Sequence, residues 1–520
     1  MPRKKIENTA PKKQKPKKPV VVKEEAQDSA KKRGIRTIAL LRGMKDVLPK
    51  ESLYWMALVQ KAQDVARSFS FHYIVTPILE EAALFTRSLG KGTDIIDKEM
   101  YTFEDRDMTK VALRPEFTAN ICRAFIQHGM HTWPQPVKVW TVGPLFRHDR
   151  PQAGRYRQHH QIDFELYGDP KPIADAEIIL TAYSIVSDLG LNVTVCVNSL
   201  GTSEDRMRYK LELVNYYRSK RGYLCDDCKK RITKNPLRLL DCKKEQCQPI
   251  KEDAPQILDW LAESSKAHFM HVLEYLDEVG VPYVLDSTLV RGLDYYNHTT
   301  FELFLADGEA TETAQSALGG GGRYDGLIEM LGGPATPAVG FGIGVERVMQ
   351  ALREAHIPVP PLTSARIYVA QLGEQATRRA LGLLNDLRKA GVAALHNFGK
   401  TGLKAQLELA NKDRAAYCVI VGQKEVVDGT AIVRDMESGI QEIIGQKQLV
   451  TYLNKKLAAL LPLEPVDPSH SAEVPKDVPP SFIPDEPVHS TLAEDEKEGE
   501  VVKDVEELEE KEVLDSGGKI

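Results

Sequence analysis

The 520-residue sequence lacks any apolar run long enough to cross a membrane, and its N-terminus lacks the apolar core of a secretion signal. A membrane span would need about 18 consecutive apolar residues. Cysteine is also scarce, and the seven cysteines are an odd number. In a chain without a secretion signal this argues for reduced thiols and against a disulfide framework. These absences predict a cytoplasmic protein without membrane association.

Composition suggests two or more domains with a tail at each end. The hydrophobic content of 42% is ordinary for a globular protein, but 520 residues exceed what one core usually organises. Residues 1–36 are rich in Lys and Pro, whereas residues 462–520 are rich in Glu, Asp and Pro. Both segments have too few apolar residues to offset the entropy of ordering them, so we expect disordered tails. The basic tail either attracts nucleic acid or simply aids solubility.

Residues 37–360 read as one mixed unit of helices and short strands. A helix is expected over 51–69, followed by an edge strand over 72–80 that Pro77 interrupts. Further strands are expected at 99–105, 111–114, 137–142, 158–168, 282–286, 293–304 and 319–327, with helices at 115–129 and 342–356. Most connections are too short for crossover helices, which favours an antiparallel sheet. Residues 204–280 are polar, helical and cysteine-bearing, and they interrupt this pattern as an insertion.

The pattern of expected strands and helices changes after a Pro-rich linker that ends near residue 364. Strands at 366–371, 392–398 and 416–422 alternate with helices at 374–391 and 400–413. This alternation is typical of a small α/β domain, which we expect over residues 365–455.

An arginine cluster is the first candidate for chemistry. Residues 143–168 hold Arg147, Arg150, Arg155 and Arg157 around a Gly-containing loop. Converging guanidiniums suit a polyphosphate, although a solvated basic loop would look the same. In the segment that follows the loop, every second residue is polar, so one face of the expected strand is wholly polar. The residues on this face are Arg157, His159, Gln161, Asp163 and Glu165. A polar strand face inside a globular domain favours a lined cavity.

Three other segments carry candidates that are ambiguous when taken alone. LRPEFTA supplies Glu116 and Thr118 where a helix should begin, and GVERV places Arg347 on a helix. A helix N-terminus and an exposed helix arginine are the plainer interpretations of these two segments. LVRGLDYYNHTTFE, residues 289–302, looks like a strand, yet it carries Arg291, Asp294 and two adjacent tyrosines. Tyrosine is often only a half-buried strand residue.

Taken together, these segments resemble the class II aminoacyl-tRNA synthetases. Residues 146–168 are similar to motif 2, FGIGVERVMQAL is similar to motif 3, and the helix and Pro-bearing strand at 51–78 are similar to motif 1. LVRGLDYYNHTTFE and GMKDVLP (residues 43–49) resemble signatures of the histidyl-tRNA synthetase family. The resemblance runs from about residue 40 to residue 455 and covers neither tail. It implies an α+β fold: a class II antiparallel sheet with flanking helices, a helical insertion, and a C-terminal anticodon-binding domain.

The resemblance also assigns residues to roles. It implies catalytic roles for Arg291, Arg147 and Arg347, and ATP binding by Arg147, Arg155, Arg157 and Arg347. It places Glu165, Tyr295 and Tyr296 at the imidazole of L-histidine, and Glu116, Thr118 and Gln161 at its α-amino group. A pocket that hydrogen-bonds its ligand rejects analogues that lack those groups by about four to five decades. Cations aimed at a pentacoordinate phosphorus stabilise the charge that builds there.

The implied reaction is the ligation of histidine to tRNA(His) through histidyl-adenylate, with Mg²⁺ accompanying ATP and a homodimer built through motif 1. The alternative is a noncatalytic synthetase-like regulatory subunit of histidine biosynthesis. Such proteins usually lose the RGLDYY segment or the anticodon-binding domain, and both are present here. In the C-terminal domain, Lys400, Lys404, Lys412 and Arg414 are candidates for phosphate contacts, although any solvated helix looks similar.

Two further motifs leave alternatives open. GGGGRYDGL (residues 319–327) does not fit a dinucleotide fingerprint. It is either backbone that a strand or a ligand approaches closely, which makes Arg323 and Tyr324 pocket candidates, or a flexible glycine turn. Cys225, Cys228, Cys242 and Cys247 form one pair and a second, wider pair. This spacing is compatible with structural zinc, but the wide second pair and a family chemistry that needs no zinc favour free surface thiols.

Overall fold

The structure is a computed structural model that describes residues 38–460 except 91–92, 94, 150–153, 307–316 and 360–365. The two expected tails, Arg150 and most of the Pro-rich linker lie outside the described residues. None of the described helices combines the length and the apolar character of a bilayer-spanning segment.

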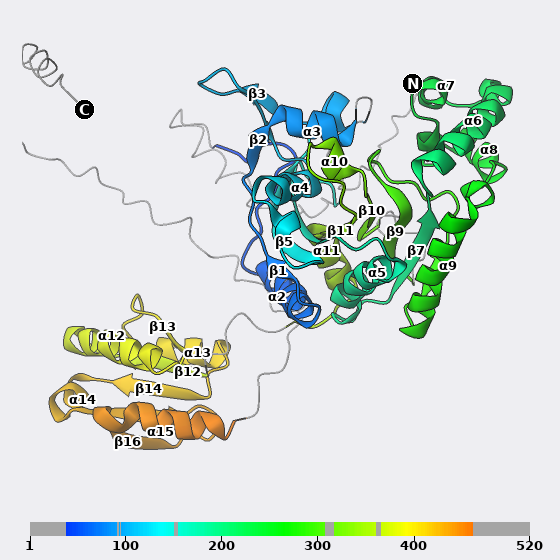
Figure 1. Cartoon of the computed structure of the whole chain (residues 1–520). Coiled ribbons are helices and arrows are strands. Elements are labelled where there is room, and N and C mark those ends of the chain that lie inside the picture. Colours follow the sequence, from blue (N-terminus) through cyan, green and yellow to red (C-terminus); the bar gives the residue numbers. More distant parts are fainter. Residues whose placement is uncertain are drawn as a thin grey trace, which may run out of the picture. The chain divides into compact units, whose positions relative to one another are not determined.

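An eight-stranded mixed sheet forms the centre of the larger unit (Figure 1). Its strands, in spatial order, are β1 (His72–Tyr73), β5 (Val137–Phe146), β6 (Gln158–Tyr167), β11 (Ala338–Gly344), β10 (Gly319–Arg323), β9 (Asn297–Leu305), β7 (Val193–Ser199) and β8 (Tyr283–Leu285). The inner pairs are antiparallel, as the short connections predicted, whereas the edge pairs β1–β5 and β7–β8 are parallel. The glycine run is the inner strand β10, so the flexible-turn interpretation is wrong.

The edge strand expected over 72–80 divides into two. Only His72–Tyr73 joins the large sheet, and β2 (Leu79–Glu81) belongs to a separate three-stranded sheet with β4 (Lys110–Leu113) and β3 (Thr102–Glu104). Pro77 lies between the two pieces, and a proline removes a backbone donor from any ladder. The expected strand over 72–80 therefore contains a break, and its position follows from which strands each piece pairs with.

Helices cover both faces of the large sheet. On one face, α2 (Ser52–Ser68), α5 (Pro172–Ser187), α9 (Glu263–Glu278) and α11 (Val345–Glu354) share a core with alternate residues of the strands. The other face is flanked by α3 (Ala82–Leu89), α4 (Thr118–Gln127) and α10 (Leu327–Met330). Two short turns, η1 (Ile95–Glu99) and η2 (Met130–Thr132), complete this side. Only the first face is uniformly apolar, which leaves the second to carry polar side chains.

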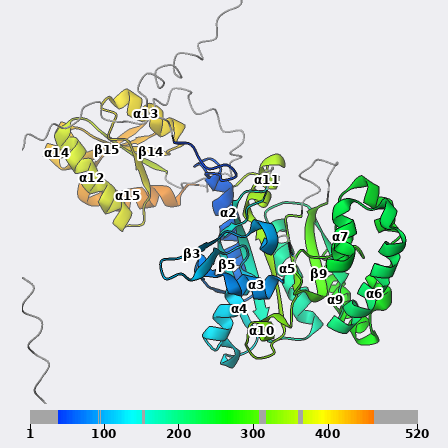
Figure 2. The same cartoon turned by 90° about the horizontal axis from the view of Figure 1, so that it is seen from above.

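The helical insertion begins with α6 (Ser203–Ser219), whose N-terminus is fixed by a capping box between Thr202 and Asp205. The elements that follow are η3 (Arg221–Tyr223), α7 (Asp226–Lys234), η4 (Pro236–Leu239), η5 (Glu245–Cys247), α8 (Gln248–Glu252) and η6 (Ile257–Trp260). Figures 1 and 2 both show α6 and α7 next to each other. The buried apolar residues from Tyr209 to Ile257 belong to the same cluster as the polar side of the sheet, whereas those of α9 join the core of the first face.

The C-terminal domain has its own five-stranded sheet, ordered β13 (Ala394–His396), β12 (Ile367–Gln371), β14 (Tyr417–Val421), β15 (Thr430–Asp435) and β16 (Gln441–Gly445). Its helices are α12 (Glu374–Lys389), α13 (Leu403–Lys412), α14 (Gln423–Asp428) and α15 (Gln446–Ala458). The first three strands are parallel, as strand–helix alternation predicts, and the last two extend the sheet antiparallel.

Candidate active site

The polar face of β6 is the floor of the candidate site. Ile162, Phe164 and Leu166 point into the core beneath α2, α5 and α11, so Asp163 and Glu165 project from the opposite face. Both carboxylates are buried. The neighbouring strand β11 makes room for them with glycine: a Cβ at Gly340 would lie 1.5 Å from Glu165 Oε2, and one at Gly342 would lie 3.0 Å from Asp163. Glu165 therefore requires glycine at position 340, whereas Gly342 leaves only a tight space beside Asp163.

Hydroxyl groups surround Glu165. Thr118 Oγ1, at the start of α4, donates to Glu165 Oε1 at 2.7 Å, and Tyr324 OH donates to Oε2. Burial raises the pKa of Glu165 to about 8, although these two hydrogen bonds oppose the shift. The rings of Tyr295, Tyr296 and Tyr324 pack against one another beside it in tilted and edge-to-face arrangements, with centroids 4.7–6.3 Å apart. The result is an aromatic enclosure with one carboxyl group and several hydroxyls.

Glu116 and Asp163 each carry a buried oxygen without a hydrogen-bond partner, Oε2 in Glu116 and Oδ1 in Asp163. The other oxygen of Glu116 accepts a 2.9 Å hydrogen bond from the backbone of Ala119. Burial raises the pKa of both carboxyl groups, and neighbouring acids raise that of Asp163 further, whereas the charge of Arg147 lowers both. Buried acceptors of this kind favour a ligand that brings donors.

The arginines lie around these acids on separate elements. Arg147 follows β5, and its Nε donates to the backbone oxygen of Pro115 at 2.8 Å. Arg347, on α11, donates to the backbone oxygen of Ala317. Burial lowers the pKa of Arg347, and the positive charges of Arg155, Arg147 and Arg291 lower it further. Such accumulated like charge is unfavourable unless an anion joins it.

Arg291 is held differently, by an ion pair with Glu302 of β9 and a 3.1 Å hydrogen bond to the backbone oxygen of Gly320. Its buried Nε has no partner. Burial alone would lower its pKa, but the negative charge of Glu302 and the interactions with Tyr296 together outweigh this and raise it. Arg291 lies in a loop, because β9 begins only at Asn297. The strand expected over 293–304 is therefore confirmed from residue 297 onward, and residues 289–296, which also looked strand-like, are not part of it. We call residues 291–296 the RGLDYY loop.

Two of the predicted arginines make contacts of their own outside the buried acids, although the charge of Arg155 still acts on Arg347. Arg155 is exposed and pairs with Asp149 at 3.4 Å, and Arg157 donates to the backbone oxygen of Arg42 at 3.3 Å. Gln161 lies on β6 opposite Gly344, two residues from Asp163 on the same face. Glu302 and Glu346 were not singled out from the sequence. Glu346 binds both the backbone and the ring Nδ1 of His160, and so anchors α11 to β6 beside Arg347.

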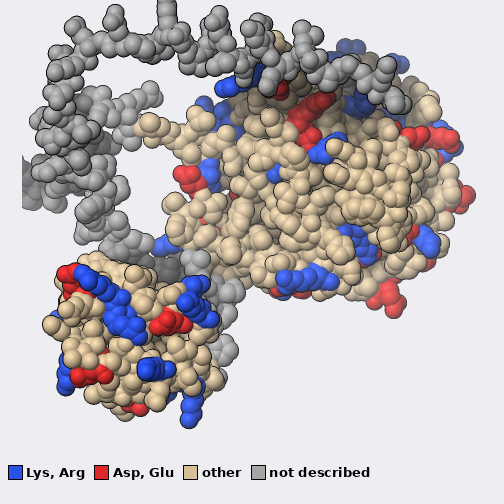
Figure 3. All heavy atoms as spheres, turned by 60° about the vertical axis from the view of Figure 1, so that its left-hand side comes forward, with Lys and Arg blue, Asp and Glu red and all other residues tan. Residues whose placement is uncertain are grey.

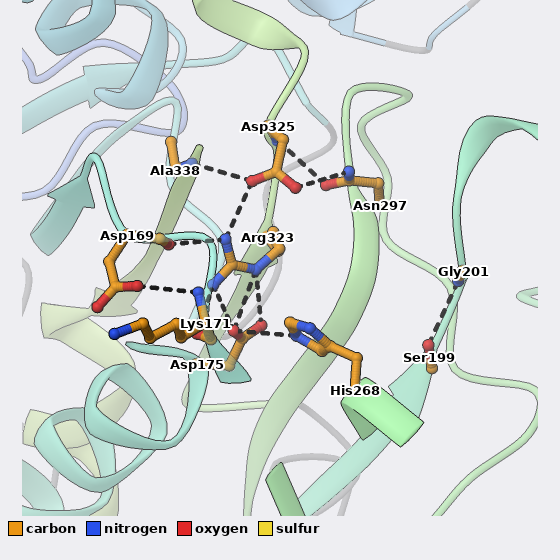
Figure 4. Close-up of polar contacts among 10 residues, drawn as sticks. All are labelled: Asp169, Lys171, Asp175, Ser199, Gly201, His268, Asn297, Arg323, Asp325 and Ala338. Carbon is orange, nitrogen blue, oxygen red and sulfur yellow. Dashed lines mark hydrogen bonds and ion pairs between the residues drawn. The ribbon is translucent and has the colours of Figure 1, made fainter. Parts of the chain in front are cut away.

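Arg323 is not a pocket residue. Figure 4 shows its guanidinium enclosed by Asp175 and Asp325, with the backbone oxygens of Asp169 and Lys171 as further acceptors. The side chain is 1% exposed and Asp175 is fully buried. The network joins α5 to β10 behind the site, which gives Arg323 a structural role. Sequence alone could not distinguish it from a substrate-binding arginine.

Replacing Arg323 by methionine should lower the free energy of unfolding by about 3–5 kcal/mol, because Asp175 would remain buried without its cation. The shift of the urea unfolding midpoint measures the loss. The double variant Arg323→Met, Asp175→Leu should recover much of it. Equal destabilisation of the single and double variants would contradict this account.

Glu165 should make stability depend on pH. Its folded-state pKa of about 8 lies above the ordinary value of 4.5, so its contribution is complete below about pH 4.5 and is lost as pH rises through about 8. Between about pH 5 and pH 8.5 the wild-type melting temperature should fall by roughly 3 °C more than that of Glu165→Gln. Thermal unfolding of both proteins at both pH values checks this. Parallel declines would show that Glu165 does not carry the effect.

Comparisons with known proteins agree with this geometry. A family model described as histidyl-tRNA synthetase matches residues 43–204 and 233–348, and one described as anticodon binding domain matches residues 366–456. Histidine–tRNA ligase of Dehalococcoides mccartyi is 45% identical over 417 residues, covering 80% of this chain and 99% of that protein. The enzyme of Desulforamulus reducens is 44% identical, covering 80% and 98%.

A solved structure agrees as well: apo S. aureus histidyl-tRNA synthetase is 34% identical, with a TM-score of 0.67, covering 80% of this chain and 99% of that one. The mixed sheet, its polar face and the separate C-terminal sheet define a class II aminoacyl-tRNA synthetase. Within that class, the chain belongs to the histidyl-tRNA synthetase family.

Proposed function

We propose that this chain attaches L-histidine to tRNA(His) in two steps. In the first, a carboxylate oxygen of histidine attacks the α-phosphorus of ATP, the bond to the bridging oxygen breaks, and pyrophosphate leaves. In the second, a ribose hydroxyl at the 3′ end of the tRNA attacks the carbonyl carbon and AMP leaves. The observation that supports this best is the meeting of buried acids and several arginines on one face of the sheet.

The arginines serve the phosphate chemistry in this proposal. Arg291 faces the α-phosphate and the histidine carboxylate, Arg147 holds the α-phosphate, and Arg347, with Arg155 and Arg157, binds the polyphosphate. The like charge accumulated around Arg347 supports these roles, because an anionic ligand would relieve it. Mg²⁺ accompanies ATP and neutralises part of the polyphosphate charge.

The acids and hydroxyls select histidine. Glu165 accepts from the imidazole, with Tyr295 and Tyr296 beside the ring, and Tyr324 joins them through its hydrogen bond to Glu165. Glu116, Thr118 and Gln161 bind the α-amino group, and the buried partnerless oxygen of Glu116 supports that role. Asp163 joins this group for the same reason.

The tRNA-binding part of the proposal concerns the C-terminal domain, over residues 365–455, which we propose to recognise the anticodon. Lys400, Lys404, Lys412 and Arg414 are all exposed around α13, where phosphates could reach them. Figure 3 shows Lys and Arg side chains, with Asp and Glu between them, over the visible face of this domain. The catalytic domain spans residues 37–360, with its insertion at about 204–280.

The proposal includes a cytoplasmic homodimer with structural zinc in each chain. An exposed apolar segment supports the dimer: Tyr73, Val75, Ile78 and Leu79 are 41–74% exposed at the edge beside β1. Light scattering of the full chain tests the dimer.

Zinc would be bound by Cys225, Cys228, Cys242 and Cys247, whose ligand atoms all lie within 4.8 Å of one another.

Amino-acid-dependent exchange of labelled pyrophosphate into ATP tests the proposed function. Exchange should occur with histidine and not with the other amino acids, and tRNA(His) should then accept the histidyl group. A folded protein without histidine-dependent exchange would instead fit the noncatalytic regulatory subunit.

A further inference from the structure

We infer that a thiolate-bound zinc ion in the insertion holds the segment 229–241 against the RGLDYY loop, so that metal occupancy controls the order of the histidine site. The role in histidine binding rests on the proposed histidine–tRNA ligase activity, whereas the metal site and its hold on the loop do not depend on that activity. The inference is built from the cysteine cluster, the contacts of the segment, and the core they share.

The cysteine cluster has the geometry of a tetrahedral site. Cys225 Sγ and Cys242 Sγ are 3.9 Å apart, and all four sulfurs lie within 4.8 Å of one another. Zinc–sulfur bonds of about 2.3 Å place tetrahedral thiolates about 3.8 Å apart. The backbone N–H of Cys225 also donates to Cys247 Sγ at 3.3 Å, an outer contact that orients a metal-bound thiolate. Three of the four cysteines are buried.

The ligands bracket the segment that reaches the site. Cys228 lies on α7, and Cys242 follows η4 closely, so a shared ion would fix residues 229–241 at both ends. Closing such a loop removes conformational freedom that the bare segment would keep. Leu239 and Leu240, beside Cys242, are buried in the same cluster as Tyr295 and Tyr296. The metal site and the histidine site therefore share one core.

Two residues of this segment contact the RGLDYY loop. Asn235 Nδ2 donates to Asp294 Oδ1 at 2.9 Å. Arg238 lies over Gly292, where an added Cβ would come within 3.0 Å of its Nη1. Arg291 and Tyr296 flank these positions in the loop. Asn235 is therefore a positioning residue, which acts on the substrate groups through the loop that carries them.

The anchor from α6 is independent of the metal. Arg206 donates to the backbone oxygens of Asp294, at 3.2 Å, and Tyr296. Arg206 precedes Cys225, the first cysteine of the four-cysteine cluster, and lies on a helix with its own capping box. Loss of zinc should therefore loosen the loop without releasing it, and the protein should remain folded while it binds histidine less well.

The experiment begins with the full chain as purified. Inductively coupled plasma mass spectrometry should find about one zinc per chain, and a thiol reagent should release it in step with modification of the four cysteines. Four freely reactive thiols without zinc, or two disulfides in the fresh protein, would overturn the metal site.

Hydrogen–deuterium exchange tests the coupling without using activity. Peptides covering residues 287–300 should exchange roughly fivefold to tenfold faster after a chelator removes the zinc, and zinc should restore protection. Asn235→Ala should speed exchange in the same peptides while keeping zinc, and the exposed Lys230→Ala on α7 is the matched control. Zinc removal that leaves this loop unchanged would overturn the coupling.

A kinetic measurement separates this inference from the proposed function. In pyrophosphate exchange, Asn235→Ala should raise KM for histidine about fivefold to tenfold with little change in kcat, because the chemical groups stay in place. An equal loss confined to kcat would overturn the positioning role. If the wild type shows no exchange at all, the proposed function fails, whereas zinc content and loop protection still decide the metal coupling.

Discussion

Replacing Arg291 by alanine is expected to reduce histidine-dependent pyrophosphate exchange by about two to three decades. The reason is its preorganisation: Glu302 and the backbone oxygen of Gly320 hold the guanidinium, while its buried Nε is left without a partner. A donor fixed before the reaction stabilises charge that develops only in the transition state. The loss should therefore fall on kcat more than on KM.

The control is Arg353→Ala, on the same helix as Arg347 but exposed and paired with Glu51. It should retain exchange within about twofold, since exposed ion pairs contribute little. Arg291→Lys should recover only part of the activity, because an ammonium cannot hold two acceptors in one plane. Full exchange in a folded Arg291→Ala protein would remove Arg291 from the catalytic groups.

The second large effect concerns selection of the amino acid. We expect the wild type to prefer histidine over thienylalanine, an isostere without ring N–H groups, by about four to five decades in kcat/KM. In Glu165→Gln this preference should fall to about one to two decades, the range that shape alone provides. Glutamine keeps the volume beside Gly340 but cannot carry the charge that an imidazole N–H favours.

Pyrophosphate exchange with each amino acid measures both ratios. Glu329→Gln, on the exposed side of α10, is the matched control and should discriminate like the wild type. If Glu165→Gln kept the full preference, recognition of the ring would have to come from the tyrosine hydroxyls alone.

The polar face of the site could be predicted from sequence because its signal is local. Alternation along 158–168 assigned Asp163 and Glu165 to one face, and the structure confirms this with apolar residues between them. The glycines of β10 and β11, in contrast, are explained only by the strands that lie next to them in the sheet. Gly340 leaves the space that the side chain of Glu165 occupies, and Glu165 is far from it in sequence. No local pattern could have indicated that requirement.

The errors share the same cause. Arg323 and Arg291 both stand beside glycine in sequence, yet their surroundings differ. Arg323 is bound by Asp175 and Asp325, whereas Arg291 pairs with Glu302 and keeps a buried Nε without a partner. The RGLDYY loop contains strand-forming residues, but two residues of the insertion hold it out of the sheet: Arg206 binds its backbone, and Asn235 binds the side chain of Asp294. In both cases, interaction partners from distant segments determine the result: the structural role of Arg323 and the loop conformation of residues 291–296. Residue propensities do not encode such partners.

The strand order of the catalytic sheet bears on how the protein is made. β6 pairs with β5, its near neighbour in the chain, and on its other edge with β11, whose last residue is Gly344. A ribosome has to extend the chain through the whole insertion before that edge is covered. Until then, nascent chains expose an unpaired β-strand edge and unfilled apolar surface, which are the features that chaperones bind. Expression of this protein should therefore depend on chaperone supply more than its final fold would suggest.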